Sequence, residues 1–91
     1  MTLMRNHVLD IVRSYCNTRD GVCFFTPRHE LITVECGEAQ VDLDLYPPEH
    51  IIWTILRKDP TWWVRTKWDW LRLNETETKL PVLLDKAFGT V

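Results

Sequence analysis

The sequence predicts an α+β fold: an N-terminal helix, a three-stranded antiparallel meander, a second helix, a tryptophan-rich fourth strand and a C-terminal helix. Apolar residues recur at helical spacing near both ends of the chain, and they alternate with polar residues in its middle. The chain has 91 residues, a length that suits one domain spanning residues 1–91.

The first expected helix runs from Leu3 to Asn17. Its apolar side chains recur every three or four residues, whereas polar side chains occupy the other side. A cluster of turn-forming residues after Asn17 ends it. The expected buried stripe consists of Met4, Val8, Ile11, Val12 and Tyr15.

Three short segments that favour strand follow, at residues 22–26, 31–36 and 40–46, joined by connections of hairpin length. We expect Pro27 to end the first of them. In the third segment, Val41, Leu43 and Leu45 alternate with two aspartates. This alternation predicts one face that packs on a core and one that is acidic and solvated.

The second expected helix opens at Pro47-Pro48-Glu49, since proline is tolerated in a first turn and a carboxylate suits the positive end of the helix dipole. Asp59-Pro60 ends it. Its expected buried stripe consists of Ile51, Ile52, Ile55 and Leu56.

The segment 61–73 fits both a strand and a ragged helix, and its Trp, Val and Thr content favours the strand. As a regular strand it would place Arg65, Lys67 and Asp69 on one face. The opposite face would carry Trp62, Val64, Thr66, Trp68 and Trp70. The last helix begins near Thr78, has Pro81 in its first turn and ends at Gly89.

The motifs of the common enzyme classes do not occur. The chain has one serine, no nucleophile-elbow motif and no glycine-rich phosphate loop. Its three cysteines, Cys16, Cys23 and Cys36, lack the spacing of a zinc site. We therefore expect no enzymatic activity, no cofactor and no metal, with cysteine catalysis as a remote alternative.

The odd number of cysteines and the charged N-terminal segment, which does not fit a signal peptide, predict reduced thiols and a cytoplasmic location. Apolar runs are too short for a membrane span, so we expect no membrane association.

Charge and tryptophan are unevenly distributed. Residues 29–56 carry six acidic and no basic side chains, whereas residues 57–72 carry five basic and two acidic ones. Four of the five tryptophans lie between Trp62 and Trp70. A core of this size cannot hide so many indoles, and exposed Trp beside Arg is typical of protein interfaces.

We therefore expect a small non-enzymatic interaction module, a regulator, inhibitor or chaperone-like adaptor that binds a partner protein stoichiometrically and forms a homo-oligomer. The expected binding strip comprises Trp62, Trp63, Arg65, Lys67, Trp68, Trp70 and Arg72. The complementary acidic face comprises Glu38, Asp42 and Asp44. Acidic and basic regions of two copies would then pair.

The alternative function is single-stranded nucleic-acid binding, with bases stacked on the same strip. The net charge of -2 disfavours a nucleic-acid partner without excluding it. The expected order of elements is similar to that of the small acidic secretion chaperones, which dimerise through a strand and a helix. That resemblance implies a chaperone-like adaptor.

Overall fold

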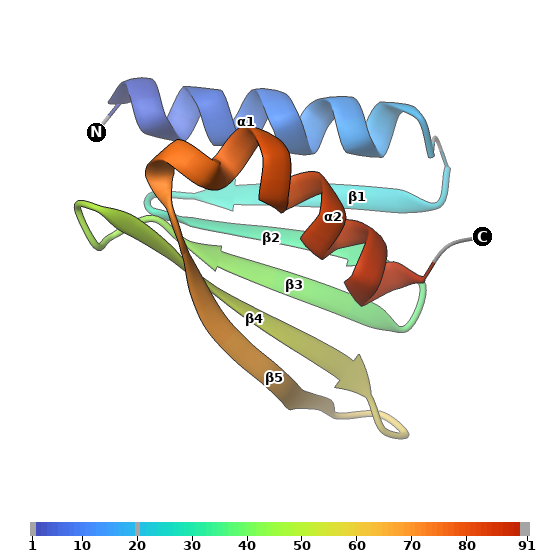
Figure 1. The fold of residues 1–91 in the computed structure, drawn as a ribbon. Coiled ribbons are helices and arrows are strands. Elements are labelled where there is room, and N and C mark those ends of the chain that lie inside the picture. Colours follow the sequence, from blue (N-terminus) through green and yellow to red (C-terminus); the bar gives the residue numbers. More distant parts are fainter. Residues whose placement is uncertain (1, 20, 90–91) are drawn as a thin grey trace.

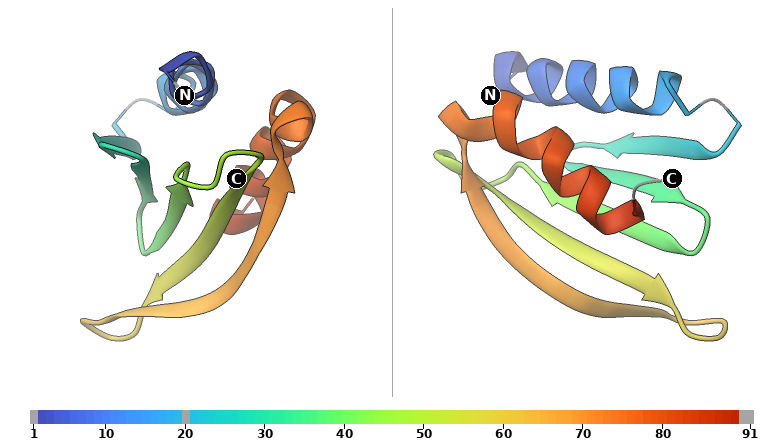
Figure 2. Two further views of the ribbon diagram at one scale, coloured as in Figure 1. Left: turned by 90° about the vertical axis from the view of Figure 1, so that its left-hand side faces the viewer. Right: turned by 45° about the vertical axis from the view of Figure 1, so that its right-hand side comes forward.

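The computed structural model describes residues 2–19 and 21–89. Two helices lie on one side of a five-stranded antiparallel sheet whose strand order follows the sequence (Figure 1). Two further views show the same two layers (Figure 2). The elements are α1 (Thr2–Asn17), β1 (Cys23–Arg28), β2 (Leu31–Cys36), β3 (Ala39–Asp44), β4 (His50–Lys58), β5 (Trp63–Arg72), the 3-10 helix η1 (Leu73–Glu75) and α2 (Thr76–Phe88).

The α+β class, the first helix and the meander of β1, β2 and β3 are confirmed. Val8, Val12 and Tyr15 on α1 are buried as expected, while the side chain of Met4 lies outside the described residues. Val41, Leu43 and Leu45 are also buried. These residues share one core cluster with the apolar side of α2, so both helices pack on the same face of the sheet.

Pro27 does not end β1, which continues to Arg28. Strand β1 is an edge of the sheet, where a residue without an N–H group need not break a ladder. The β2–β3 hairpin turns through Gly37, whose φ of 62° is one that glycine adopts without strain.

The expected second helix is wrong, because residues 50–58 form β4 between β3 and β5. Ile51 and Ile55 are four residues apart and both buried, which suits one side of a helix as well as one face of a strand. The intervening Trp53 also packs on the core, and that completes the strand pattern. The order of elements is therefore not the one on which the resemblance to secretion chaperones rests.

Residues 63–72 form a strand, as expected, but it is the fifth strand of the sheet, β5. The side chains of β5 do not alternate regularly between its two faces. Ile55 pairs with Lys67 and Leu56 pairs with Arg65, so Thr66 is an extra residue in a β-bulge. Because of the bulge, Trp63 and Arg65 share a face with Trp68 and Trp70.

The expectation of three reduced thiols is wrong, because Cys23 and Cys36 form a disulfide between β1 and β2. The two residues are direct partners in the strand register, with 4.3 Å between their Cα atoms. Cys16 is a free, buried thiol, and burial raises its pKa.

Helix α2 begins at Thr76, two residues before the expected start. The buried Thr76 hydroxyl donates a 2.8 Å hydrogen bond to the carbonyl of Leu73 in the 3-10 turn. Leu80, Leu83 and Leu84 then face the core.

Candidate functional site

Among the described residues, no helix lies over the face of the sheet opposite the two helices, which is here called the open face (Figure 2). Its residues alternate along each strand with the buried ones. On β4 and β5 the cross-strand neighbours of this face are Ile52 with Trp70, Thr54 with Trp68, Leu56 with Arg65 and Lys58 with Trp63. We call these eight residues the aromatic patch.

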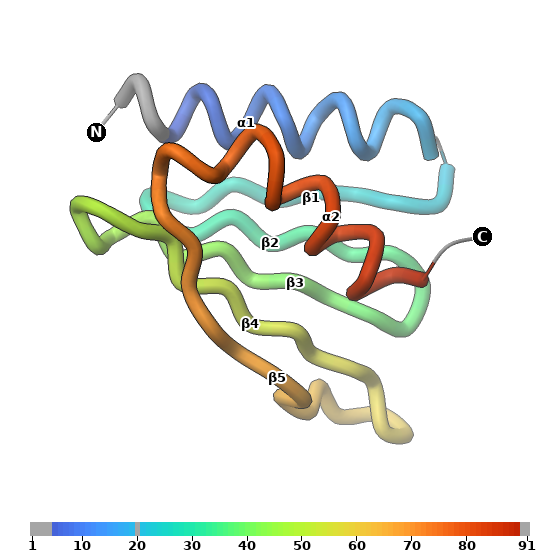
Figure 3. The backbone as a smooth tube through the Cα atoms, viewed as in Figure 1, coloured from blue at the N-terminus to red at the C-terminus, as the bar shows by residue number. Residues whose placement is uncertain are grey.

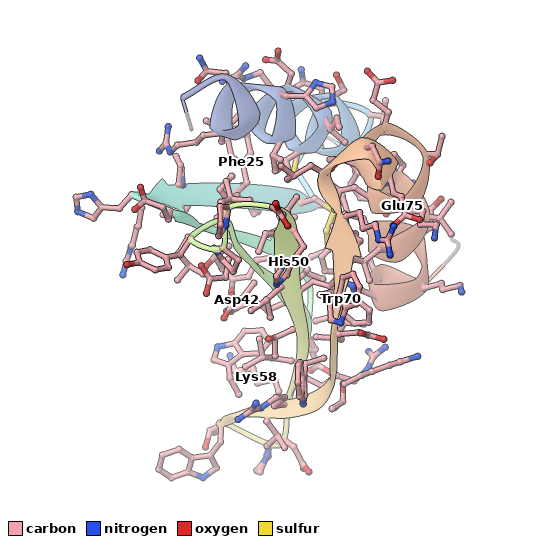
Figure 4. All side chains as sticks on the ribbon, turned by 60° about the vertical axis from the view of Figure 1, so that its left-hand side comes forward. Phe25, Asp42, His50, Lys58, Trp70 and Glu75 are labelled. Carbon is pink, nitrogen blue, oxygen red and sulfur yellow. A yellow bond between two sulfur atoms is a disulfide. The ribbon has the colours of Figure 1, made fainter. Side chains whose placement is uncertain are left out.

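The indoles of the patch and its hairpin reach solvent. Trp62, Trp68 and Trp70 keep 73%, 57% and 49% of their surface exposed, and Trp63 is half-buried. Trp62 lies in the loop between β4 and β5, at the end of the sheet marked by Lys58 in Figure 4. The described structure therefore leaves three large aromatic side chains uncovered on or beside one surface.

Neighbouring side chains hold Trp70 in place. Its ring lies 5.4 Å from that of His50, and its backbone N–H donates a 2.8 Å hydrogen bond to the carboxylate of Asp69. Arg72 is the strand partner of His50 and extends the patch with a second guanidinium. Figure 4 labels both His50 and Trp70 on these two strands.

The acidic residues lie beside the aromatic patch and not at an opposite pole. Asp42 and Asp44 pair with Thr54 and Ile52 across β3 and β4, so they lie on the open face next to the patch. Asp42 accepts hydrogen bonds from Thr33 and Gln40, at 3.1 Å and 2.9 Å. These bonds fix the carboxylate close to the indoles.

Two members of the predicted sites lie elsewhere. Lys67 pairs with Ile55, so it lies on the helix-covered face of the sheet, away from Arg65. Glu38 is in the β2–β3 turn, where its carbonyl accepts the backbone N–H of Lys58. The residues of the predicted strip therefore lie on both faces of β5, with Arg65 on the face of Trp68 and not, as expected, on that of Lys67.

The sequence reasoning missed Ile52 and Leu56, which belong to the open face and not to a buried helix stripe. It also missed Phe24 and Leu31, exposed on the same face at β1 and β2. No local pattern places Ile52 and Leu56 there, because apolar residues occupy both odd and even positions between 50 and 58.

Within residues 2–19 and 21–89, no three His, Cys, Asp or Glu side chains group as metal ligands. Neither described helix is long and apolar enough to span a bilayer. Comparison with protein-family models, with curated proteins and with solved structures finds no match.

Proposed function

We propose that the protein is a non-enzymatic module that binds another protein through the aromatic patch. The observation that carries this proposal is the exposure of Trp68 and Trp70 on a sheet face that no described helix or strand covers. Trp and Arg together dominate the binding energy of many protein interfaces.

The indoles supply most of the expected affinity. Covering the exposed half of one indole removes about 100 Å² from water and stabilises a complex by about 2.5 kcal/mol. A solvent-exposed ion pair made by Arg65 or Arg72 contributes about 0 to 1 kcal/mol. The arginines would therefore orient the partner, whereas Trp68 and Trp70 would hold it.

The neighbouring carboxylates favour a protein over a nucleic acid. Asp42 and Asp44 are on β3, two strands from β5, a separation of about 10 Å. That separation is close to the Debye length of about 8 Å, so both carboxylates would repel a phosphate backbone on the patch. A second copy is one possible protein partner, because each copy carries basic aromatic and acidic residues side by side.

A photo-cross-linker at position 68 tests the proposal in cells. Trp68→p-benzoylphenylalanine should form adducts of higher mass that nucleases do not remove, and Arg65→Glu with Trp70→Ser in the same chain should abolish them. The matched control is Asn17→p-benzoylphenylalanine on the exposed end of α1, which should give no such adduct.

The masses of the adducts separate the alternatives. A ladder at whole multiples of the chain mass identifies a second copy as the partner, and another mass identifies a different protein. Adducts that nuclease removes would overturn the proposal in favour of nucleic-acid binding. Equal adducts at positions 68 and 17 would overturn it altogether.

A further inference from the structure

A second surface, on the opposite side of β5, lies between α2 and the helix-covered face of β4 and β5. The outer parts of these strands curve away from α2, as the backbone tube shows (Figure 3). The resulting groove has a volume of about 570 Å³, within the range of small-molecule sites.

The floor of the groove is apolar. Trp53 and Ile55 from β4, Leu71 from β5 and Leu83 from α2 all line it. Trp70, on the edge strand β5, also lines it and so borders both the groove and the aromatic patch. Val82 forms part of the helix wall and is 52% exposed. An apolar ligand chain would therefore cover side chains that the fold itself leaves partly open.

The charged side chains are distributed unevenly between the two ends of the groove. At the start of α2, Lys79 and Glu75 form an ion pair of 2.6 Å, so their charges offset each other. Hydrogen bonds from Lys79 and from the backbone of Arg72 lower the pKa of Glu75, which keeps it ionised. This end of the groove carries no net charge to attract an ionic group.

The other end of the groove is cationic. Lys86 is in the last turn of α2, where Arg57 donates a hydrogen bond to the carbonyl of Ala87. Lys67 pairs with Ile55, two residues before Arg57, so both lysines lie toward this end. Among the described residues, neither lysine makes an ion pair.

From this arrangement we propose that the groove binds a small amphipathic carboxylate, with its anionic head at Lys67 and Lys86 and its apolar chain along Trp53 and Leu83. Two unpaired ammonium groups beside an apolar floor complement one anionic head on one apolar tail. The groove lies between a helix and a strand pair, a shape that admits a single chain and not a flat lipid surface.

Dodecanoate is the probe that tests this site, with its neutral analogue dodecanol for comparison, titrated calorimetrically into the intact protein. Dodecanoate should bind saturably, and dodecanol should bind about fivefold more weakly because it lacks the charge. In ¹H–¹⁵N spectra, dodecanoate should shift the Trp53 indole and the amides of Val82 and Leu83.

Lys67→Gln with Lys86→Gln should weaken dodecanoate binding by about fivefold. Both side chains are exposed, so the fold should be unaffected. The matched control, Arg28→Gln with Lys58→Gln, makes the same change of charge on the open face and at the β1 hairpin, and should leave binding unchanged.

Three results would overturn the proposal: no saturable binding, equal binding to the parent and the lysine variant, or shifts confined to Trp63 and Trp68, which do not line the groove. The last result would place the ligand on the open face. Trp70 lines the groove, but Trp68 does not. Cross-linking at position 68 and the dodecanoate titration can therefore fail independently, so a failure here leaves the proposed protein-binding function standing, and the reverse also holds.

Discussion

The hydroxyl of Tyr15 donates a 2.9 Å hydrogen bond to the carboxylate of Asp85 and so connects α1 to α2. Arg19 bonds the same carboxylate oxygen at 3.1 Å and lies over the Tyr15 ring at 3.8 Å. Burial, followed by the bond to Asp85, raises the pKa of Tyr15 to about 12. The two helices therefore share a polar contact that depends on a protonated phenol.

This contact predicts a loss of stability at high pH. The pKa of Tyr15 is higher in the folded protein than in the unfolded chain, where it is near 10. The contribution of Tyr15 to the unfolding free energy is therefore complete below pH 10 and is lost as the pH rises toward 12. Two pKa units correspond to about 2 to 3 kcal/mol of unfolding free energy. Urea denaturation at several pH values measures the loss.

Tyr15→Phe is the control for this prediction, because other titrating groups affect parent and variant alike. The variant should lose about 1 kcal/mol at neutral pH, where the hydrogen bond is missing. It should then show a smaller decline than the parent between pH 10 and 12. Identical declines in the two proteins would contradict the role of Tyr15.

The disulfide predicts a second measurable effect on stability. Cys23 and Cys36 are separated by 13 positions in the sequence, and closing a loop of that size stabilises a fold by about 3 kcal/mol. Cys23→Ser with Cys36→Ser should lower the unfolding free energy by that amount in urea denaturation. Reduction of the parent should have the same effect.

Thiol counting provides the control for the disulfide. The folded, unreduced protein should offer one thiol, Cys16, which reacts slowly because it is buried and its pKa is raised. Cys16→Ala should leave no reactive thiol and should keep the bridge. Alkylation of three thiols without a reductant would show that the bridge does not form.

Local patterns in the sequence were enough to predict α1 and the first three strands. Val8 and Val12 repeat at helical spacing, and Val41 and Leu43 alternate with aspartates, so each element carries its own signal. Strand β4 had no such unambiguous signal. It is inserted between β3 and β5, and its pairing with them outweighs the helix-like spacing of Ile51 and Ile55.

Substitutions on the two faces of the sheet should differ in their effect on the unfolding free energy. Ile51 is fully buried, so Ile51→Ala should cost about 2 to 5 kcal/mol through lost burial and a cavity. Trp68 is exposed on the open face, so Trp68→Ala should change the unfolding free energy by less than about 1 kcal/mol. A larger loss at Trp68 would show that its ring is needed for folding and not held free for a partner.

Substitution of Gly37 should lower the unfolding free energy through backbone conformation alone. Its φ is 62°, and a Cβ atom there would meet no other atom within 4 Å. Gly37→Ala should therefore cost about 1 to 2 kcal/mol through backbone strain alone. Gly37→Asn should cost less, since asparagine tolerates this conformation better. Equal stability of Gly37→Ala and the parent would contradict the turn geometry.

About half of the candidate site could be predicted from the sequence. The cluster of Trp68, Trp70 and Arg65 is visible in the composition alone, and these residues do share a face. Their position beside Asp42 depends on strand order, and the presence of Arg65 on the face of Trp68 depends on the bulge. Both arise from pairing between distant segments, as does the bridge between Cys23 and Cys36.

The bulge at Thr66 has a consequence for how this protein can change over generations. Removing Thr66 would leave Arg65 opposite Leu56 and Lys67 opposite Ile55, so each would keep its present partner. The local bend of β5 would relax, because a bulge increases the twist of its strand. The 3.1 Å hydrogen bond from the Thr66 hydroxyl to the carbonyl of Ile55 would be lost. One in-frame codon deletion could thus shorten this strand without turning over any indole, so its length can change while the residues on both of its faces are kept.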